Sequence, residues 1–512
     1  MPYAQIVPLG APVDREMTYR VPDLLSGTLG LGSRVLVPMG ARKLTGIVVG
    51  QSQITDIAED RIKDIEEVLD PYPLVEAPLL ELCRWVARYY VCTLSEVLSA
   101  ALPAGIHRDS GRAVALSDPA PPAESDLSAR QREVLSCLTT LRSATVRQLE
   151  RRLGKAGTQA AVDSLLRQGV LSSFQKASKA RVGTKTERIA EWIAPDPGWL
   201  DRELPVLERR APRQAECIRL LVESQSPLPV AHLSALGITS AVLRALSEHQ
   251  VIRLSNREVR RDPYANIAAD PAEALLPTPL QQSAIDAIQN TLGQKTFGVH
   301  LLHGVTGSGK TLVYIAAVAH ALKAGLGAIV LVPEITLTPQ TVRRFRSHFG
   351  DQIAVLHSAL SDGERYDAWR EVREGKRPVV IGARSAIFAP VDHLGLIVID
   401  EEHDGSYKQA DPSPRYNARD VAIMRAKLQN ATVVLGSATP SLESYHNAQT
   451  EKFSLLTLPE RIDNRPMPEV TVVDMRQEGG GMFSKLLREK IHDRIHRDER
   501  IILLQNRRGY AP

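Results

Sequence analysis

The sequence has few cysteines, little net charge and no long hydrophobic run, and each of these absences excludes a class of protein. Its four cysteines are dispersed along 512 residues, without the C-x-x-C spacing of a metal site or the density of a disulfide framework. We interpret them as small core residues in a reducing cytoplasm: Cys83, Cys92, Cys137 and Cys217. No apolar stretch reaches the length of about 20 residues that spans a membrane, and the N-terminus shows no signal-peptide pattern. We therefore expect a cytoplasmic protein without a membrane partner.

The rest of the composition is that of an ordinary globular protein. Hydrophobic residues make up 43% of the chain and charged residues 24%, which supplies ample core material. At the usual domain size, 512 residues correspond to roughly three or four domains. The net charge of +4 and the pI of about 8.8 tilt the chain weakly towards anionic partners.

The chain is organised around the segment GVTGSGKT, which fits the pattern G-x-x-x-x-G-K-[ST] without a mismatch. It lies between the apolar run Val299–His303 and the helix-like run Leu312–Leu322. In such a loop the glycines let backbone N–H groups face an anion, the lysine reaches the β- and γ-phosphates, and the hydroxyl binds Mg²⁺. A glycine-rich turn without a ligand is the alternative, which the flanking strand and helix disfavour. The sequence therefore predicts a site for ATP and Mg²⁺ at Gly304, Val305, Thr306, Gly307, Ser308, Gly309, Lys310 and Thr311.

An acidic motif follows a later apolar run. Leu396–Ile399 leads directly into DEEH, Asp400–His403. Downstream of a phosphate loop, acids at a strand end are typical of the second half of a nucleotide site. We expect Asp400 to hold Mg²⁺ through water, and Glu401 to orient and deprotonate the attacking water. The predicted catalytic residues are therefore Lys310, Asp400 and Glu401.

The segment GSATPS, Gly436–Ser441, follows the next apolar run, Thr432–Leu435. Its position one strand after the acids favours a coupling role over that of a plain loop. We predict that the hydroxyls of Ser437 and Thr439 sense the γ-phosphate or the acids and transmit that state.

From about Leu276 onward, short β-branched runs alternate with helical stretches, which is typical of a parallel sheet covered on both faces. The phosphate loop and the acids both fall in this region, so we expect a multidomain α/β protein whose nucleotide-binding unit covers residues 270–460. The predicted strands are Val299–His303, Ala328–Val332, Val379–Ile381, Leu396–Ile399, Thr432–Leu435 and Ile501–Leu504.

The first 105 residues follow a different pattern. Short β-like runs such as Ala4–Leu9 and Leu44–Gly50 predict a small, mostly-β barrel or sandwich. A helical stretch, Leu79–Leu98, follows them. Residues 106–126 include LSDPAPPAESD, which is rich in proline, alanine and acid, and we interpret them as a linker.

Residues 127–195 and 196–265 resemble each other. ARQREVLSCL (Ala129–Leu138) parallels PRQAECIRLL (Pro212–Leu221), and each copy ends in a β-like run. Three short helices followed by β structure predict two winged-helix-like domains. Arginines in the first copy suit phosphates, but many winged helices pack against protein, so both partner classes stay open.

GVTGSGKT, DEEH and GSATP, in this order, resemble the motifs of superfamily 2 helicases. The intervals between them resemble the primosomal protein N′ family of replication-restart helicases over nearly the whole chain. The segments that carry this resemblance are VPMGARKLTGIV, WVARYYVCTLSEVLSAALPAG, LVPEITLTPQ, HSALSDGERYDAW, GARSAIFAP, PRYNARDVA and NRRGYAP. The resemblance implies a domain for the 3′ end of a nascent DNA strand at 1–105, a first RecA-like lobe at 270–460, and the start of a second RecA-like lobe at 461–512.

The resemblance also assigns roles to individual residues. Within TPLQQ, Gln281 takes the place of the adenine-reading residue. The stretch Asp404–Asp420 takes the place of an aromatic-rich loop that couples single-stranded DNA to the ATP site. Tyrosines stack on bases and cations take phosphates, so its expected DNA contacts are Tyr407, Lys408, Arg415 and Tyr416. The expected residues of the 3′-end pocket are Gly40, Lys63 and Thr18.

The implied function is that of an ATP-dependent 3′-to-5′ DNA helicase that recognises stalled or abandoned forks and D-loops and initiates primosome assembly. The implied partners are forked and single-stranded DNA, primosome proteins and single-strand DNA-binding protein. The implied location is the cytoplasm, in association with the nucleoid. The complete family protein also carries zinc, and its cysteine-rich ligands are not in this sequence, which we expect to end partway through the second lobe.

Two other hypotheses stay open. A truncated, non-unwinding fragment would act as a fork-binding scaffold. A transcription regulator would join winged helices to an unrelated ATPase, but the spacing of LVPEITLTPQ, GARSAIFAP and GSATP argues against it.

Overall fold

The computed structural model describes residues 2–10, 15–40, 42–103, 110–117, 127–154, 156–177, 185–193, 196, 198–264, 276–462, 466, 468–478 and 482–504. The chain divides into two compact units, Met1–Glu460 and Arg461–Pro512, and each is considered by itself. The motif NRRGYAP and most of the predicted linker 106–126 lie outside the described residues.

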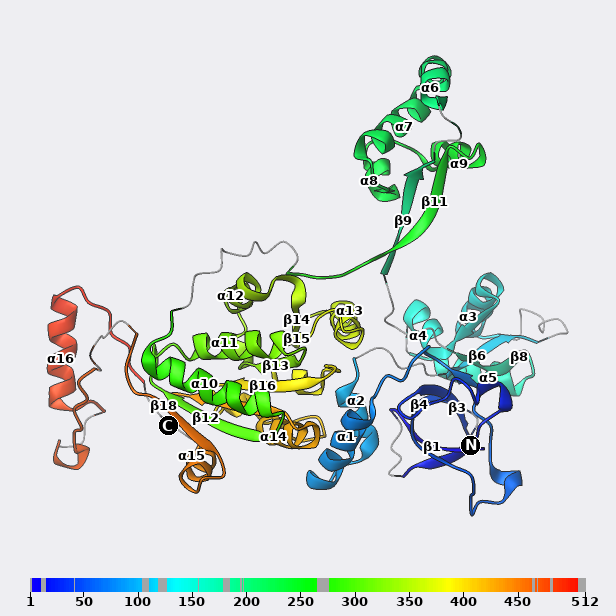
Figure 1. Cartoon of the computed structure of the whole chain (residues 1–512). Coiled ribbons are helices and arrows are strands. Elements are labelled where there is room, and N and C mark those ends of the chain that lie inside the picture. Colours follow the sequence, from blue (N-terminus) through cyan, green and yellow to red (C-terminus); the bar gives the residue numbers. More distant parts are fainter. Residues whose placement is uncertain are drawn as a thin grey trace. The chain divides into compact units, whose positions relative to one another are not determined.

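The N-terminal module is mostly β, as the sequence predicts. Its described strands form one antiparallel sheet in the order β2-β1-β4-β3-β5 (Figure 1). Apolar side chains on one face of this sheet, such as Ile6, Val35 and Val48, form a small core of their own. The elements are β1 (Tyr3–Pro8), β2 (Met17–Arg20), η1 (Asp23–Leu25), β3 (Arg34–Met39), β4 (Arg42–Ser52), η2 (Glu59–Arg61) and β5 (Glu67–Val68).

Two helices follow where the sequence predicts one helical stretch. They are α1 (Ala77–Tyr89) and α2 (Leu94–Ala101). The chain breaks between them because Val91 adopts a positive φ of 53°, and Thr93 then begins α2 with a capping box to Glu96. Their apolar faces pack into the same core as one face of the large parallel sheet of the chain.

The first winged-helix-like domain begins earlier than the sequence predicts. Ser110–Leu116 forms a strand, β6, that pairs with both β7 and β8, so the prediction of a continuous linker over 106–126 is wrong at these residues. β6 is the central strand of the sheet β7-β6-β8, so its backbone hydrogen bonds join it to the domain that follows. The other elements are α3 (Ala129–Leu141), β7 (Ser143–Thr145), α4 (Val146–Leu153), α5 (Thr158–Arg167) and β8 (Leu171–Ala177).

The second winged-helix-like domain also begins with a strand, so it starts before the predicted boundary at 195/196. β9 (Lys185–Trp192) falls in the predicted first domain, yet it pairs with β10 and β11 of the second. The leading strand thus belongs to the domain that follows it in both copies. The other elements are α6 (Trp199–Arg210), α7 (Pro212–Ser224), β10 (Leu228–Pro229), α8 (Val230–Ala235), α9 (Ser240–Glu248) and β11 (Ile252–Val259).

The nucleotide-binding lobe is a parallel sheet covered on both faces, which confirms the predicted fold class. Its described strands have the order β14-β15-β13-β16-β17-β12-β18, and every pairing is parallel. In the order of the chain they are β12 (Gly298–Gly304), β13 (Gly327–Leu331), β14 (Ile353–Leu356), β15 (Val379–Gly382), β16 (Leu394–Asp400), β17 (Thr432–Ser437) and β18 (Ser454–Leu458).

The helices of this lobe divide between the two faces of the sheet (Figure 1). One face packs against α10 (Pro279–Gln294), α11 (Lys310–Lys323) and α12 (Pro339–Phe349). The opposite face packs against α1, α2, α13 (Asp362–Arg373), α14 (Ala418–Gln429) and α15 (Leu442–Gln449). Short 3₁₀ turns complete the lobe at η4 (Glu334–Thr336), η5 (Gly350–Gln352), η6 (Arg384–Phe388) and η7 (Gly405–Tyr407).

The C-terminal unit contains the 3₁₀ turn η8 (Met475–Gln477) and the helix α16 (Lys485–His496). The predicted strand Ile501–Leu504 is wrong for this structure, because these residues are irregular and Ile502 and Leu504 are 95% and 94% exposed. A β-branched apolar run forms a strand only when neighbouring strands pair with it.

Candidate nucleotide and DNA site

The phosphate loop joins the buried strand β12 to helix α11. Gly307 and Gly309 adopt positive φ angles of 86° and 80°, a backbone region that side chains disfavour. A Cβ on Gly304 would lie 2.6 Å from the Ser308 Oγ and 3.0 Å from the Leu458 Cβ, so a side chain there would fill the inside of the loop. The three glycines therefore make the concave backbone that the sequence predicts.

The polar atoms of this loop suit an anion. The Lys310 ammonium is buried and donates a hydrogen bond to the Gly304 carbonyl over 2.8 Å, which folds the side chain over the loop. Within the described residues, the Ser308 Oγ is buried and has no hydrogen-bond partner. A buried polar atom without a partner is uncommon and marks a place where a bound group supplies the partner. The loop therefore fits the phosphates of a nucleotide.

Gln281 contacts the phosphate loop directly. Its Oε1 accepts a hydrogen bond from the Thr278 N–H over 2.8 Å, and its Nε2 donates to the Ser308 carbonyl over 2.7 Å. The side chain is 2% exposed. Both ends of the amide are thus engaged within the protein, in a capping box that also holds the phosphate loop in place. The role of Gln281 in reading adenine stays a prediction, and the sequence analysis missed its contact with Ser308.

The acids lie at the carboxyl end of β16, beside the phosphate loop. Asp400 accepts a hydrogen bond from the Tyr314 Oη over 2.9 Å, and Asp400 and Thr311 line the same cavity. Hydroxyl and carboxylate oxygens are ligands that Mg²⁺ prefers, so these two residues fit the predicted metal. Burial raises the pKa of Asp400, and burial together with the Asp400 charge raises the pKa of Glu401.

Tyr314 is a site residue that the sequence analysis missed. It lies one turn into α11, on the face that meets the acids, and its ring is 2% exposed. A Cβ on Gly436 would lie 1.6 Å from the Tyr314 Oη, so only glycine fits at this point of β17. The spacing of four residues between Lys310 and Tyr314 is the signal that places both side chains on one helix face.

The predicted coupling hydroxyls lie beside the acids. The His403 Nδ1 and the Ser437 Oγ are hydrogen-bonded over 2.7 Å, and the Thr439 N–H donates to the same Ser437 Oγ over 2.9 Å. The His403 Nε2 lies 3.4 Å from the Thr439 Oγ1. The structure thus brings the two motifs together, and the transmission of a nucleotide state by Ser437 and Thr439 stays a prediction.

Glu402 is a further residue that the sequence analysis did not single out. Its carboxylate is buried and accepts hydrogen bonds from the Arg419 guanidinium, the Ser441 N–H and the Ser444 hydroxyl over 3.1, 2.6 and 2.9 Å. It therefore ties the acidic motif to the first turn of α14 and to the start of α15.

The loop Asp404–Asp420 does not present its tyrosines to solvent. Tyr407 and Tyr416 are each 1% exposed and belong to the core on one face of the sheet. The Tyr407 Oη donates to the Asp400 carbonyl over 2.6 Å, and burial raises the pKa of Tyr416 to about 12. In this structure both rings are buried, so their stacking on DNA bases would require the loop to open, and it stays a prediction.

The cations of the same loop are exposed. Lys408 donates to the Arg415 carbonyl over 2.6 Å, and its ammonium lies 5.1 Å from the ring centroid of Tyr90 in the N-terminal module. The Arg384 guanidinium donates to the carbonyls of Ser406 and Lys408, each over 3.1 Å, and so fixes the backbone of the loop at these two residues. Of the predicted DNA contacts in this loop, Lys408 and Arg415 are the two that solvent reaches.

The structure joins two of the three residues predicted for the 3′-end pocket. The Lys63 ammonium donates to the Gly40 carbonyl over 3.2 Å, and Gly40 has a positive φ of 58° with open space where a Cβ would lie. Thr18 lies on β2, where it pairs with Gln5 of β1. The assignment of all three to a DNA end stays a prediction.

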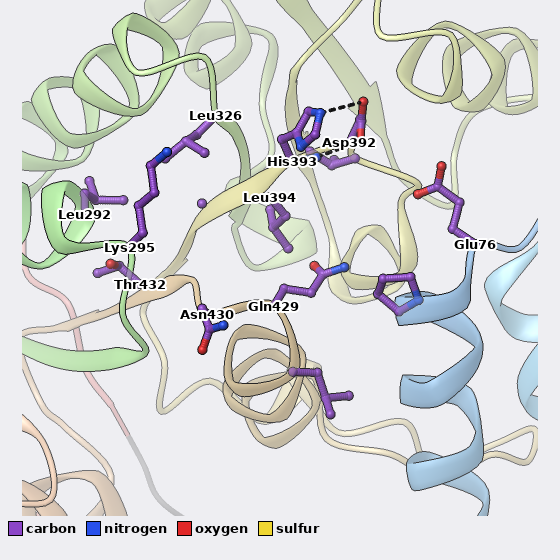
Figure 2. Close-up of a pocket in the computed structure, with 14 residues that line it drawn as sticks. Glu76, Leu292, Lys295, Leu326, Asp392, His393, Leu394, Gln429, Asn430 and Thr432 are labelled. Atoms are coloured by element: carbon purple, nitrogen blue, oxygen red, sulfur yellow. Dashed lines mark hydrogen bonds and ion pairs between the residues drawn. The ribbon is translucent and has the colours of Figure 1, made fainter.

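A separate cavity lies at the opposite edge of the parallel sheet, where β16 and β17 begin (Figure 2). Figure 2 shows Lys295, His393 and Asn430 around it, with Glu76 at its rim. None of the predicted site residues lines this cavity. The predicted nucleotide site is instead at the carboxyl edge, where the loops after parallel strands converge.

Comparison with known proteins defines the class of protein first. The family description "3′DNA-binding domain (3′BD)" matches residues 6–103, and the description "DEAD/DEAH box helicase" matches residues 278–448. A solved structure titled "Structure of RecG bound to three-way DNA junction" is 26% identical over 38% of this chain and 25% of that chain, with a TM-score of 0.30. The chain thus combines a DEAD/DEAH box helicase domain with a 3′DNA-binding domain.

The chain is similar, over nearly its whole length, to replication restart proteins of the PriA family. Replication restart protein PriA of Bacillus subtilis (strain 168) is 36% identical, over 98% of this chain and 61% of that protein. Its counterpart in Synechocystis sp. is 35% identical, over 96% of this chain and 59% of that protein. The chain therefore spans about three fifths of the length of these curated relatives. Across the part of the chain that the structure describes, no helix combines the length and apolarity needed to cross a membrane.

Proposed function

We propose that this chain forms the ATP-hydrolysing and DNA-binding part of a replication-restart helicase that moves 3′ to 5′ on DNA and acts at stalled forks and D-loops. The observation that carries this proposal is the convergence of Lys310, Asp400 and Ser437 at one edge of the parallel sheet. Similarity to the PriA replication restart proteins supports the restart function, with primosome proteins and single-strand DNA-binding protein as the proposed partners.

In the proposed reaction, Lys310 turns its ammonium from the Gly304 carbonyl to the β- and γ-phosphates of ATP, which the loop N–H groups also contact. Thr311 and Asp400 hold Mg²⁺, whose charge offsets that of the phosphates. Glu401 orients the attacking water and takes its proton. The raised pKa of Glu401 makes its carboxylate a stronger base than an exposed glutamate.

DNA contacts are proposed at two places. Lys408 and Arg415 meet the phosphates of single-stranded DNA because they are exposed. Tyr407 and Tyr416 can stack on bases only after the loop opens. Gly40, Lys63 and Thr18 form the proposed contact with a 3′ end. Zinc is proposed only for the complete family protein, and the described residues contain no group of three or more His, Cys, Asp or Glu that could hold a metal.

The test is an ATPase assay on the 512-residue chain with and without forked DNA, using Glu401→Gln as the variant and Glu443→Gln, exposed on α15, as the control. We expect DNA to stimulate hydrolysis and Glu401→Gln to abolish it while ATP binding persists. Forks with a 3′ or a 5′ tail then test the direction of unwinding. Hydrolysis at the parent rate in Glu401→Gln would overturn the assignment of the site. Fork binding without any hydrolysis by the parent chain would favour the scaffold hypothesis.

A further inference from the structure

One side chain of the N-terminal module contacts the loop Asp404–Asp420 and the start of α14. The Tyr90 Oη donates a hydrogen bond to the Asp420 Oδ2 over 3.4 Å and accepts one from the Asn417 N–H over 3.1 Å. The face of its ring lies 5.1 Å from the Lys408 ammonium. Such a contact between an ammonium and an aromatic ring is attractive. Tyr90 therefore engages an exposed DNA-binding candidate and the residues that begin α14.

The residues that Tyr90 holds are connected to the acids of the nucleotide site. Asp420 accepts a hydrogen bond from the Arg419 Nε over 3.3 Å, and the Arg419 Nη1 donates to the Glu402 carboxylate over 3.1 Å. Glu402 follows Asp400 and Glu401 directly in the sequence. Its N–H donates to the Gly436 carbonyl over 3.1 Å, which places it between β16 and β17. A series of direct contacts thus runs from Tyr90 to the motif that carries the catalytic acid.

Two charges of this series, those of Arg419 and Glu402, are largely removed from water, whereas the Asp420 side chain is 35% exposed. The Glu402 side chain is fully buried and that of Arg419 is 14% exposed. Charges removed from water interact more strongly than exposed ones, and removal of one partner leaves the other without compensation. A small displacement of Arg419 therefore changes the surroundings of Glu402 and of the adjacent acids.

Helix α1 packs directly against α14. Leu79, Cys83 and Val86 of α1 share a core with Val421 and Ala422 of α14. On α14, the buried Arg425 donates to the Ala389 carbonyl over 2.8 Å, which ties the helix to the chain after η6. Tyr90, the residue that follows α1, thus extends from a helix packed into the same core as α14 and contacts the loop Asp404–Asp420.

We propose that Tyr90 is a positioning residue that holds the loop Asp404–Asp420 in its closed arrangement and competes with DNA for Lys408. When a DNA phosphate binds Lys408, the Lys408 ammonium moves away from the Tyr90 ring. The contacts of Tyr90 with Asn417 and Asp420 then change, and Arg419, which is bonded to both Asp420 and Glu402, transmits the change to Glu402. The inference rests on the proposed function, since it assigns to the N-terminal module a control over hydrolysis in the helicase lobe.

The test compares Tyr90→Phe, which removes only the hydroxyl, with Tyr89→Phe, an exposed neighbour on the same helix. Tyr90→Phe removes the hydrogen bonds to Asp420 and from the Asn417 N–H. We expect it to raise DNA-independent hydrolysis about two- to tenfold, the effect of about 0.5–1.5 kcal/mol that a hydrogen bond typically contributes. The KM for ATP and the kcat at saturating DNA should not change, because the phosphate loop is untouched and DNA already releases the contact. The melting temperature should stay close to that of the parent, which separates positioning from a merely structural role.

Two further measurements keep the outcome decisive. In a double-mutant cycle, Asp420→Ala and Tyr90→Phe should together change hydrolysis by less than the sum of their separate effects, since both remove the hydrogen bond between the Tyr90 hydroxyl and Asp420. Hydrogen exchange should show loss of protection at the Asn417 amide in Tyr90→Phe, and in the parent after addition of an oligothymidylate. Unchanged protection at Asn417 in the variant would overturn the inference even if the chain hydrolyses no ATP. Altered protection without any DNA-stimulated hydrolysis would keep the positioning role and count against the proposed function instead.

Discussion

The phosphate loop and the loop Asp404–Asp420 satisfy their polar groups in opposite ways. In the phosphate loop, the Ser308 hydroxyl is buried and has no hydrogen-bond partner among the residues that the structure describes, and the glycines leave space for a ligand. In the other loop, Tyr407 is hydrogen-bonded and buried, and Lys408 rests between a carbonyl and a ring. To bind its proposed nucleotide, the first region gives up one contact, that of the Lys310 ammonium with the Gly304 carbonyl. The second must give up several contacts before its tyrosines can meet DNA, so the proposed DNA binding there costs more conformational free energy than the proposed ATP binding.

The burial of the tyrosines gives the largest expected effect. Tyr416→Ala removes a fully buried ring that packs against Phe388, and should lower the free energy of unfolding by about 3–5 kcal/mol. Arg415→Ala, exposed in the same loop, should change it by less than about 0.5 kcal/mol. Urea unfolding of both variants measures the difference. Equal, small effects would mean that Tyr416 is a surface residue, and the contrast between the two loops would disappear.

A substitution in the phosphate loop should have a comparably large effect on the rate of ATP hydrolysis. Lys310→Ala should lower ATP hydrolysis by about 10²–10³-fold, the usual cost of removing one donor from a developing charge. Fork binding should persist, because Lys310 is buried under the loop and away from the exposed cations. Lys323→Ala, exposed in the last turn of the same helix, is the matched control. A DNA-stimulated ATPase assay with filter binding checks both expectations. If Lys310→Ala hydrolyses ATP at the parent rate, the assignment of the nucleotide site to this loop is wrong.

Much of the nucleotide site follows from the sequence. The phosphate loop, the acids after β16 and the hydroxyls after β17 each occupy the carboxyl end of a predicted strand, and the parallel sheet brings them together. The spacing within each motif is local information, which a sequence carries directly. The contacts of Tyr314 with Asp400 and of Gln281 with Ser308 join residues far apart in the chain, and no local pattern reports them.

The sequence is less informative for the other loop and for the domain boundaries. A resemblance identifies Asp404–Asp420 as an aromatic loop, yet it does not say whether the rings lie in the core or in solvent. Composition likewise marks 106–126 as a linker, although Ser110–Leu116 pairs with β8 over its full length. A short strand of small and polar residues is formed by its partners rather than by its own propensity.

Close packing at the nucleotide site predicts an intermediate effect. Gly436→Ala places a methyl group 1.6 Å from the Tyr314 Oη, so the ring must move, at a cost of about 1–3 kcal/mol in stability. The added substitution Tyr314→Phe should recover part of this loss, since it removes the closest atom. Gly405→Ala, in the other loop, meets no atom within 4 Å and should be close to neutral. Thermal unfolding measures all four proteins, and equal costs at Gly436 and Gly405 would contradict the difference in packing.

The smallest expected effect concerns the N-terminal module, whose predicted DNA contact is intermediate in character between the phosphate loop and the loop Asp404–Asp420. Lys63 already donates to the Gly40 carbonyl, but the bond is exposed, so little stability depends on it. Lys63→Ala should therefore leave the melting temperature almost unchanged and weaken binding of a DNA duplex with a recessed 3′ end. Loss of one phosphate contact should reduce the slope of log K against log salt by about 0.7–0.9. Lys43→Ala, whose ammonium is paired with Glu66, is the control for a general loss of positive charge. If the two variants lose the same affinity and salt dependence, Lys63 acts only through net charge, and the proposed 3′-end contact at Gly40 and Lys63 is wrong.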